Sequence, residues 1–131
     1  MKIPTFALLA PLLAATYAAA DSINDCGDSS FDNNSSGGSP EVSDCQQIAA
    51  NIAGGGSWTL DGSSVQRQLV QYGTCAFGAW ATGLTYIGNA DIIGLIDDSI
   101  SQFEWNGLVG ASGEMDCQYG PSRTYWAIYH T

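Results

Sequence analysis

The sequence predicts a small α+β domain in which two helices pack on one mainly antiparallel sheet, stapled by two disulfides. Three observations predict this class. Apolar residues recur at helical spacing over residues 40–52 and 89–103, short apolar runs between glycines are typical of strands, and four cysteines occur in 131 residues.

Residues 1–20 have the pattern of a secretory signal peptide. Lys2 provides a positive start, residues 6–13 are apolar, and Ala18–Ala20 provide a small-residue cleavage site. We therefore expect a single domain over residues 21–131, secreted into an extracellular, oxidising compartment. No later segment has enough continuous apolar residues to cross a bilayer.

The chain is strongly acidic, with a formal net charge of −10, and its basic residues beyond the signal peptide are Arg67 and Arg123. Such a surface repels phosphate backbones and anionic lipids, so we expect no nucleic-acid binding and no direct membrane insertion. The charge is compatible with a cationic partner, a neutral polysaccharide or divalent cations. We expect the domain to be a monomer.

The N-terminal segment is predicted to hold a short edge strand at residues 29–31, followed by a polar loop at residues 33–38. Two overlapping glycosylation sequons start in this loop, at Asn33 and Asn34. Because the two acceptors are adjacent, we expect at most one of them to carry a glycan.

The first helix is expected to begin with Ser39 as its N-cap and Pro40 at its first helical position. Glycines 54–56 end it. The expected buried face shares apolar side chains at helical spacing: Val42, Cys45, Ile48, Ala49 and Ile52.

Between the helices we expect a short strand at residues 58–60 and a turn at residues 61–62. A longer strand is then expected from Val65 through the Cys75 segment, with a bulge near Gly73. Residues 80–86 are expected to form a loop or a strand end.

The second helix is predicted over residues 89–103, with Asn89 as its N-cap and Asp91 in its first turn. Asn106 and Gly107 are expected to stop it. A kinked strand over residues 108–117, a turn at residues 119–122 and a closing strand at residues 124–129 complete the prediction.

An even number of cysteines in a small secreted chain indicates two disulfides, which four cysteines can form in three ways. We predict the nested pairs Cys45–Cys75 and Cys26–Cys117. Cys45 should lie on the core face of a helix and Cys75 in the central strand, with the other two near the ends of the domain. A zinc site is disfavoured because His130 is the only histidine, so no metal or cofactor is expected.

Candidate catalytic residues are few. His130 is the only histidine, the residue type whose unperturbed pKa lies near neutrality, but no G-x-S-x-G motif accompanies it, so an exposed terminal histidine is favoured. Glu114 and Asp116 share a strand face, as a glycosidase acid–base pair does, although a polar sheet face is favoured. We therefore predict no enzymatic activity.

Two groups of residues are candidates for binding. Asp25, Asp28 and Asp32 could gather a calcium ion, but the EF-hand loop pattern is absent, so a solvated acidic segment is favoured. The four tryptophans could form a platform for sugar rings, although most tryptophans are at least partly buried. Trp105, at the end of a helix, is the best candidate for exposure among Trp58, Trp80, Trp105 and Trp126.

Several collinear blocks resemble a known family, and together they span the predicted mature chain. They begin with Cys26–Phe31, Ser39–Cys45 and Tyr72–Gly78, and they continue with Gly88–Ile93, Leu95–Ile100, Val109–Cys117 and Trp126–Thr131. The sequence is similar to the fungal necrosis-inducing secreted effectors known as the extracellular protein 2 family.

The resemblance implies a secreted fungal protein that acts on, or is recognised by, a host or competitor and can provoke plant cell death. Members occur alone or attached to chitinase-like domains, and a fold similar to viral killer toxins has been suggested. The resemblance transfers no catalytic residue. We therefore expect a non-enzymatic effector that binds a host or competitor protein or a surface glycan. The alternatives are a killer-toxin-like antimicrobial and a carbohydrate-binding or glycoside-hydrolysing module.

Overall fold

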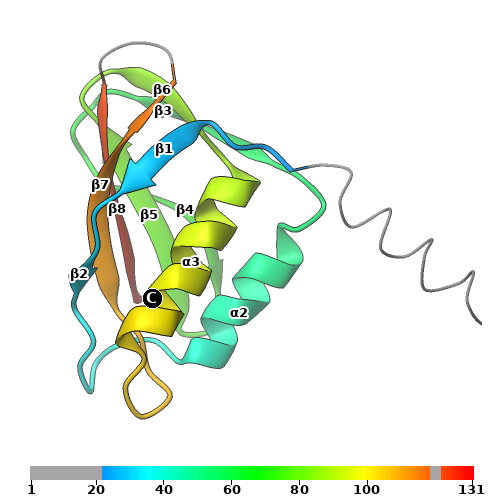
Figure 1. The fold of residues 1–131 in the computed structure, drawn as a ribbon, viewed down its shortest axis with the longest axis vertical. Coiled ribbons are helices and arrows are strands. Elements are labelled where there is room, and N and C mark those ends of the chain that lie inside the picture. The colour runs from blue at the N-terminus through cyan, green and yellow to red at the C-terminus, as the bar shows by residue number, and fades with distance from the viewer. Residues whose placement is uncertain (1–21, 119–121) are drawn as a thin grey trace, which may run out of the picture.

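The computed structural model describes residues 22–118 and 122–131 (Figure 1). The expected signal peptide and most of the expected turn at residues 119–122 lie outside the described residues.

The main sheet is antiparallel throughout, with strand order β1-β7-β8-β5-β4, and β2 also pairs with β7. Its strands are β1 (Cys26–Ser29), β2 (Asp32–Asn33), β4 (Arg67–Tyr72), β5 (Cys75–Ala81), β7 (Ala111–Cys117) and β8 (Arg123–His130). The helices α2 (Val42–Asn51) and α3 (Asn89–Phe103) lie against one face of it (Figure 1). The α+β class is confirmed.

A second sheet was not predicted. It pairs β3 (Ser57–Asp61) with β6 (Leu84–Gly88) and lies at one end of the molecule (Figure 1). Residues 80–86, expected to be a loop or strand end, contain the end of β5 and most of β6. The alternation that marks β6 is short: Thr85 and Ile87 are buried and Leu84 and Tyr86 are more exposed, but Gly88 is buried again.

The core lies between the main sheet and the two helices. Strand β8 shows the period of two expected for a sheet with one covered face, since Thr124, Trp126 and Ile128 are buried and their neighbours are more exposed. The Trp126 ring stacks on Phe77, with centroids 5.9 Å apart, and meets the edge of Phe31 at 5.6 Å. This aromatic group fixes β5, β8 and the N-terminal segment around one centre.

The expected long strand through Gly73 is wrong, because β4 and β5 form a hairpin that pairs Tyr72 with Cys75. Gly73 has φ 54°, a left-handed conformation that two-residue hairpin turns require and glycine adopts without strain. Asp44 on α2 accepts a hydrogen bond from the Thr74 N–H at 2.8 Å, which holds the turn against the helix. The expected bulge lies further back, between Gln68 and Val70.

Both predicted N-caps are wrong. The Ser39 hydroxyl accepts from the Ser36 N–H at 2.9 Å, and α2 starts after Glu41. The start is delayed because the Pro40 carbonyl accepts from the Val109 N–H and Glu41 bridges to Leu108.

Helix α3 has the predicted bounds, but Gly88 is its N-cap and Asn89 is its first residue. The Asn89 side chain is buried, where it accepts from the Ile23 N–H and donates to the Ile52 carbonyl. The predicted edge strand at residues 29–31 overlaps only the end of β1, since Phe31 turns inward toward Trp126.

Candidate functional site

Two disulfides join the elements around the core. Cys45 on α2 is bonded to Cys75 in β5, with an S–S distance of 2.07 Å. Cys26 in β1 is bonded to Cys117 in β7, with an S–S distance of 2.04 Å, and the two residues are also Cα partners in the sheet. The first bond joins α2 to β5 and the second joins β1 to β7. A pocket lies between β1 and α3.

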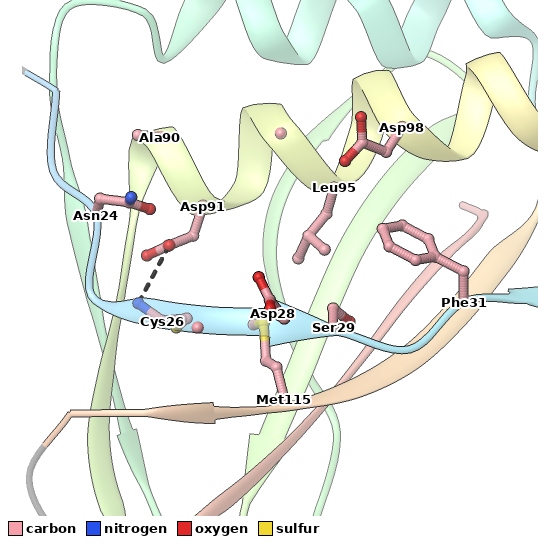
Figure 2. Close-up of a pocket in the computed structure, with 12 residues that line it drawn as sticks. Asn24, Cys26, Asp28, Ser29, Phe31, Ala90, Asp91, Leu95, Asp98 and Met115 are labelled. Atoms are coloured by element: carbon pink, nitrogen blue, oxygen red, sulfur yellow. Dashed lines mark hydrogen bonds between the residues drawn. The ribbon is translucent and has the colours of Figure 1, made fainter.

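This pocket, called the β1–α3 pocket, has a volume of about 410 Å³ and opens to solvent (Figure 2). Its apolar floor is formed by Leu95, Met115 and Phe31. On the α3 side of the pocket, Gly94 contributes no side chain, and a Cβ added there would meet nothing within 4 Å. A glycine in the middle of a helix costs stability, and here it leaves the pocket open.

Three carboxylates line the β1–α3 pocket, of which one is buried and two are exposed. Asp91 is buried, and it accepts hydrogen bonds from the N–H groups of Asp25, Cys26 and Gly88 at 2.8, 3.2 and 2.8 Å. It therefore joins the N-terminal segment to the first turn of α3. Asp28 and Asp98 are exposed, one on each wall of the pocket (Figure 2).

The acidic cluster considered from the sequence is not assembled. Of Asp25, Asp28 and Asp32, only Asp28 lines this pocket, and Asp32 pairs with Ser112 in the sheet. Over residues 22–118 and 122–131, no group of three or more His, Cys, Asp and Glu side chains is arranged to hold a metal ion.

Glu114 and Asp116 share one sheet face, as predicted, but Arg123 lies between them. Its Nε donates to Glu114 at 2.9 Å and its Nη1 donates to Asp116 at 3.0 Å. These bonds raise the pKa of Arg123, the Asp116 bond most. The Asp116 side chain is 74% exposed, so the pair lies on an open surface and neither residue lines a described pocket.

His130 is exposed, and its Nδ1 lies 3.0 Å from the Thr131 backbone oxygen. In this contact the partner of the imidazole is a backbone oxygen, and not the hydroxyl or thiol of a catalytic nucleophile.

The tryptophans occupy different environments. Trp126 is buried, and Trp58 and Trp80 are partly buried, with Trp80 stacked on Tyr125 at a centroid distance of 4.2 Å. Trp105 is 51% exposed. It therefore remains the tryptophan best placed to meet a ligand.

Trp105 borders a second pocket, called the turn pocket, of about 290 Å³. Three segments form it: residues 33–36, the end of α3 and the turn that starts at Trp105. The Asn33 side chain lines it, whereas the Asn34 Nδ2 donates to Ser112 at 2.8 Å. Both asparagines are exposed, and glycosylation at either one stays a prediction.

Comparison with known proteins identifies the family. A family model described as "Pathogen effector; putative necrosis-inducing factor" matches residues 25–117, which is more than half of the chain. The chain belongs to the Hce2 effector family. The match confirms the resemblance stated from the sequence. It covers both disulfides, the turn pocket, and every lining residue of the β1–α3 pocket except Asn24.

A curated relative of this Hce2 domain is named "Probable chitinase LysM18", from Penicillium expansum. The two sequences are 36% identical over 115 residues, which covers 82% of this chain and 8% of the relative. The chain thus corresponds to a small part of a much longer protein.

The α3 residues that line the β1–α3 pocket in this Hce2 domain were not predicted from the sequence. Neither Asp98 nor Gly94 was singled out from the sequence, because nothing local shows which strand faces a helix. One signal was available: Gly94 lies between apolar residues in the middle of the helix, where a glycine usually has a packing or functional reason.

Proposed function

We propose that this Hce2 domain is a secreted effector that binds a protein target of a host or competitor and performs no catalysis. The observation that carries this proposal is the β1–α3 pocket, with its apolar floor and a carboxylate on each wall. Secretion is supported by the family, by the two disulfides and by the signal-peptide pattern at residues 1–20.

The pocket favours a cationic side chain of the target. None of its lining residues is basic, and Asp28 and Asp98 can face a lysine or arginine head group while Leu95 and Met115 contact its aliphatic stem. The formal net charge of −10 would also increase the rate of encounter with a basic surface. A lysine or arginine on an exposed loop of the target is the expected occupant.

The groups that catalysis would need are engaged elsewhere. Glu114 and Asp116 are both paired to Arg123 on an open sheet face, and neither lines a described pocket. A glycosidase instead needs its two carboxyl groups to flank the scissile bond of a bound substrate. Binding is therefore the better-supported mode of action.

The test is infiltration of the purified, oxidised protein into leaves, with cell death measured by ion leakage. Gly94→Leu fills the pocket with a side chain, and the double variant Asp28→Asn, Asp98→Asn removes its charge; both should abolish cell death. Asp97→Asn is the matched control, because Asp97 neighbours Asp98 on α3 without lining the pocket, and it should act like the native protein.

Full activity of both pocket variants would contradict the role of the pocket. If the native protein is inactive across many plants but inhibits fungal or bacterial growth, the killer-toxin alternative replaces the plant-effector function. A disulfide-free variant shows whether either activity needs the folded domain.

A second candidate function is binding of a neutral polysaccharide. Two observations favour it: the name of the chitinase relative and the exposure of Trp105. Co-sedimentation of the protein with insoluble chitin would test this function directly, with cellulose as the comparison polymer.

A further inference from the structure

We infer that the turn pocket holds one sugar unit of a neutral polymer of N-acetylglucosamine. This inference rests on the second candidate function and assigns it to particular residues. The pocket is lined by residues at the end of α3, just before the chain turns back toward β7. Figure 1 shows that this end of α3 lies away from the β3–β6 sheet.

The walls of the turn pocket are fixed by hydrogen bonds. Trp105 and Leu108 exchange two backbone hydrogen bonds of 2.9 Å, and φ is 52° at Asn106 and 78° at Gly107, which defines a tight turn. The Ser35 hydroxyl donates to the Phe103 carbonyl at 2.8 Å and accepts from the Gly110 N–H at 3.0 Å. The three segments are thus tied together before any ligand arrives, which lowers the entropic cost of binding.

The side chains of the turn pocket match the surface of a pyranose ring. An indole offers a flat apolar face to the C–H groups of a sugar, and Trp105 stands half exposed at the pocket edge. Asn33, Gln102 and Glu104 supply amide and carboxylate groups that can bond to ring hydroxyls and to an acetamido group. A volume of about 290 Å³ is near the lower end of ligand pockets and suits a single sugar unit.

Charge selects the class of sugar. The lining residues include Glu104 and no lysine, arginine or histidine, so phosphorylated and acidic sugars would be repelled. The overall charge of −10 acts in the same direction. Glu104 is also the one carboxylate among the lining residues, whereas hydrolysis of a glycosidic bond uses two. The turn pocket is therefore a site of binding.

The position of Asn33 determines how glycosylation would affect access to the turn pocket. A glycan attached to Asn33 would start from the wall of the turn pocket and block it, whereas Asn34 bonds to Ser112 and its glycan would leave the pocket open. The two adjacent sequons thus differ in their effect on binding.

The test is titration of the unglycosylated protein with the N-acetylglucosamine hexamer, followed by tryptophan fluorescence and calorimetry. We expect Trp105→Ala and Gln102→Ala each to weaken binding, Trp105→Ala by about tenfold or more. Tyr72→Ala is the matched control, because Tyr72 is 47% exposed, against 51% for Trp105, and does not line the pocket. It should bind like the native protein. Circular dichroism of each variant confirms that it is folded.

The outcomes distinguish a failure of the second candidate function from a failure of the site assignment. If the native protein binds neither the hexamer nor insoluble chitin, the second candidate function fails, and the inference fails with it. If the native protein binds and Trp105→Ala binds equally well, polysaccharide binding stands and the turn pocket is the wrong site. Equal affinity for cellohexaose, which lacks acetamido groups, would overturn the selectivity for N-acetylglucosamine.

Discussion

Asp44 shows how one half-buried carboxylate can fix a turn. It accepts hydrogen bonds from both the N–H and the hydroxyl of Thr74, each 2.8 Å long, and so attaches α2 to the β4–β5 turn. These bonds, the backbone one first, lower the pKa of Asp44 below its ordinary value of 3.8. The ionised form therefore stabilises the fold above that pH, and this contribution is lost as the pH falls through the lowered pKa.

We expect Asp44→Asn to lower the thermal midpoint at pH 7. The difference from the native protein should narrow as the pH falls through the lowered pKa of Asp44, where the native carboxylate also becomes neutral. Thermal denaturation followed by circular dichroism across this range measures both values. A difference that is independent of pH would show that shape, not charge, is what the turn needs.

The pKa of Asp97 is shifted in the opposite direction. Burial, and secondly the charge of Asp98, raise the pKa of Asp97 above 3.8. Its ionised form therefore destabilises the fold at neutral pH, and protonation removes this penalty as the pH falls through the raised pKa. We predict that Asp97→Asn raises the thermal midpoint at pH 7 and that the gain shrinks on acidification below the raised pKa. Equal or lower stability at pH 7 would contradict this account.

At the scale of elements, two glycines with opposite surroundings provide a test of packing. A Cβ at Gly113 in β7 would meet the Ser30 carbonyl oxygen at 2.1 Å and the Trp126 ring at 2.9 Å. A Cβ at Gly94 in α3 would meet nothing within 4 Å. The first glycine is required by close packing, and the second is a conformational cost to the helix.

We expect Gly113→Ala to destabilise the domain by about 1–3 kcal/mol through overpacking. Gly94→Ala should stabilise it by about 0.5–1 kcal/mol, because alanine loses less backbone entropy in a helix. Urea denaturation of both variants gives the two changes in free energy of unfolding. Similar values for the two variants would refute the difference in packing.

An element could be predicted from the sequence where the residues that determine it lie close together in the chain. Helix α3 carries a periodic pattern over 15 residues, and its bounds were predicted correctly. The β4–β5 hairpin was missed because Gly73 turns against Asp44, which lies on α2 about thirty residues earlier. The β1–α3 pocket was missed for the same reason: Asp28 and Asp98 are far apart in the chain, and only the tertiary fold brings β1 beside α3. Exposure of Trp105 was predicted because a residue next to a helix end, just before Asn-Gly, has little chance of burial.

For the whole molecule, the two disulfides differ in the loops they close. Cys26 and Cys117 are 91 positions apart, whereas Cys45 and Cys75 are 30 apart. In the chain-entropy account, the wider loop contributes about 4–5 kcal/mol and the narrower one about 3–4 kcal/mol. Both values are large for a domain of this size.

We therefore predict that serine replacement of Cys26 and Cys117 lowers the free energy of unfolding more than serine replacement of Cys45 and Cys75. Guanidinium denaturation of the two double variants compares them directly. The reverse order would mean that strain or residual structure, rather than loop length, governs the contribution of each bond. Among the described residues, no helix is long and apolar enough to cross a membrane.

Strand β8 lies between β7 and β5 and pairs with both along most of its length. Two halves of the main sheet, built from residues far apart in the chain, are therefore joined by a strand translated after all of them. While the nascent chain emerges from the ribosome, β4 and β5 can form their hairpin, but Ala76 and Gly113 still lack their neighbour on β8. The main sheet therefore cannot be completed until residues 123–130 have been released, so its two halves stay separate while the segment between them is made.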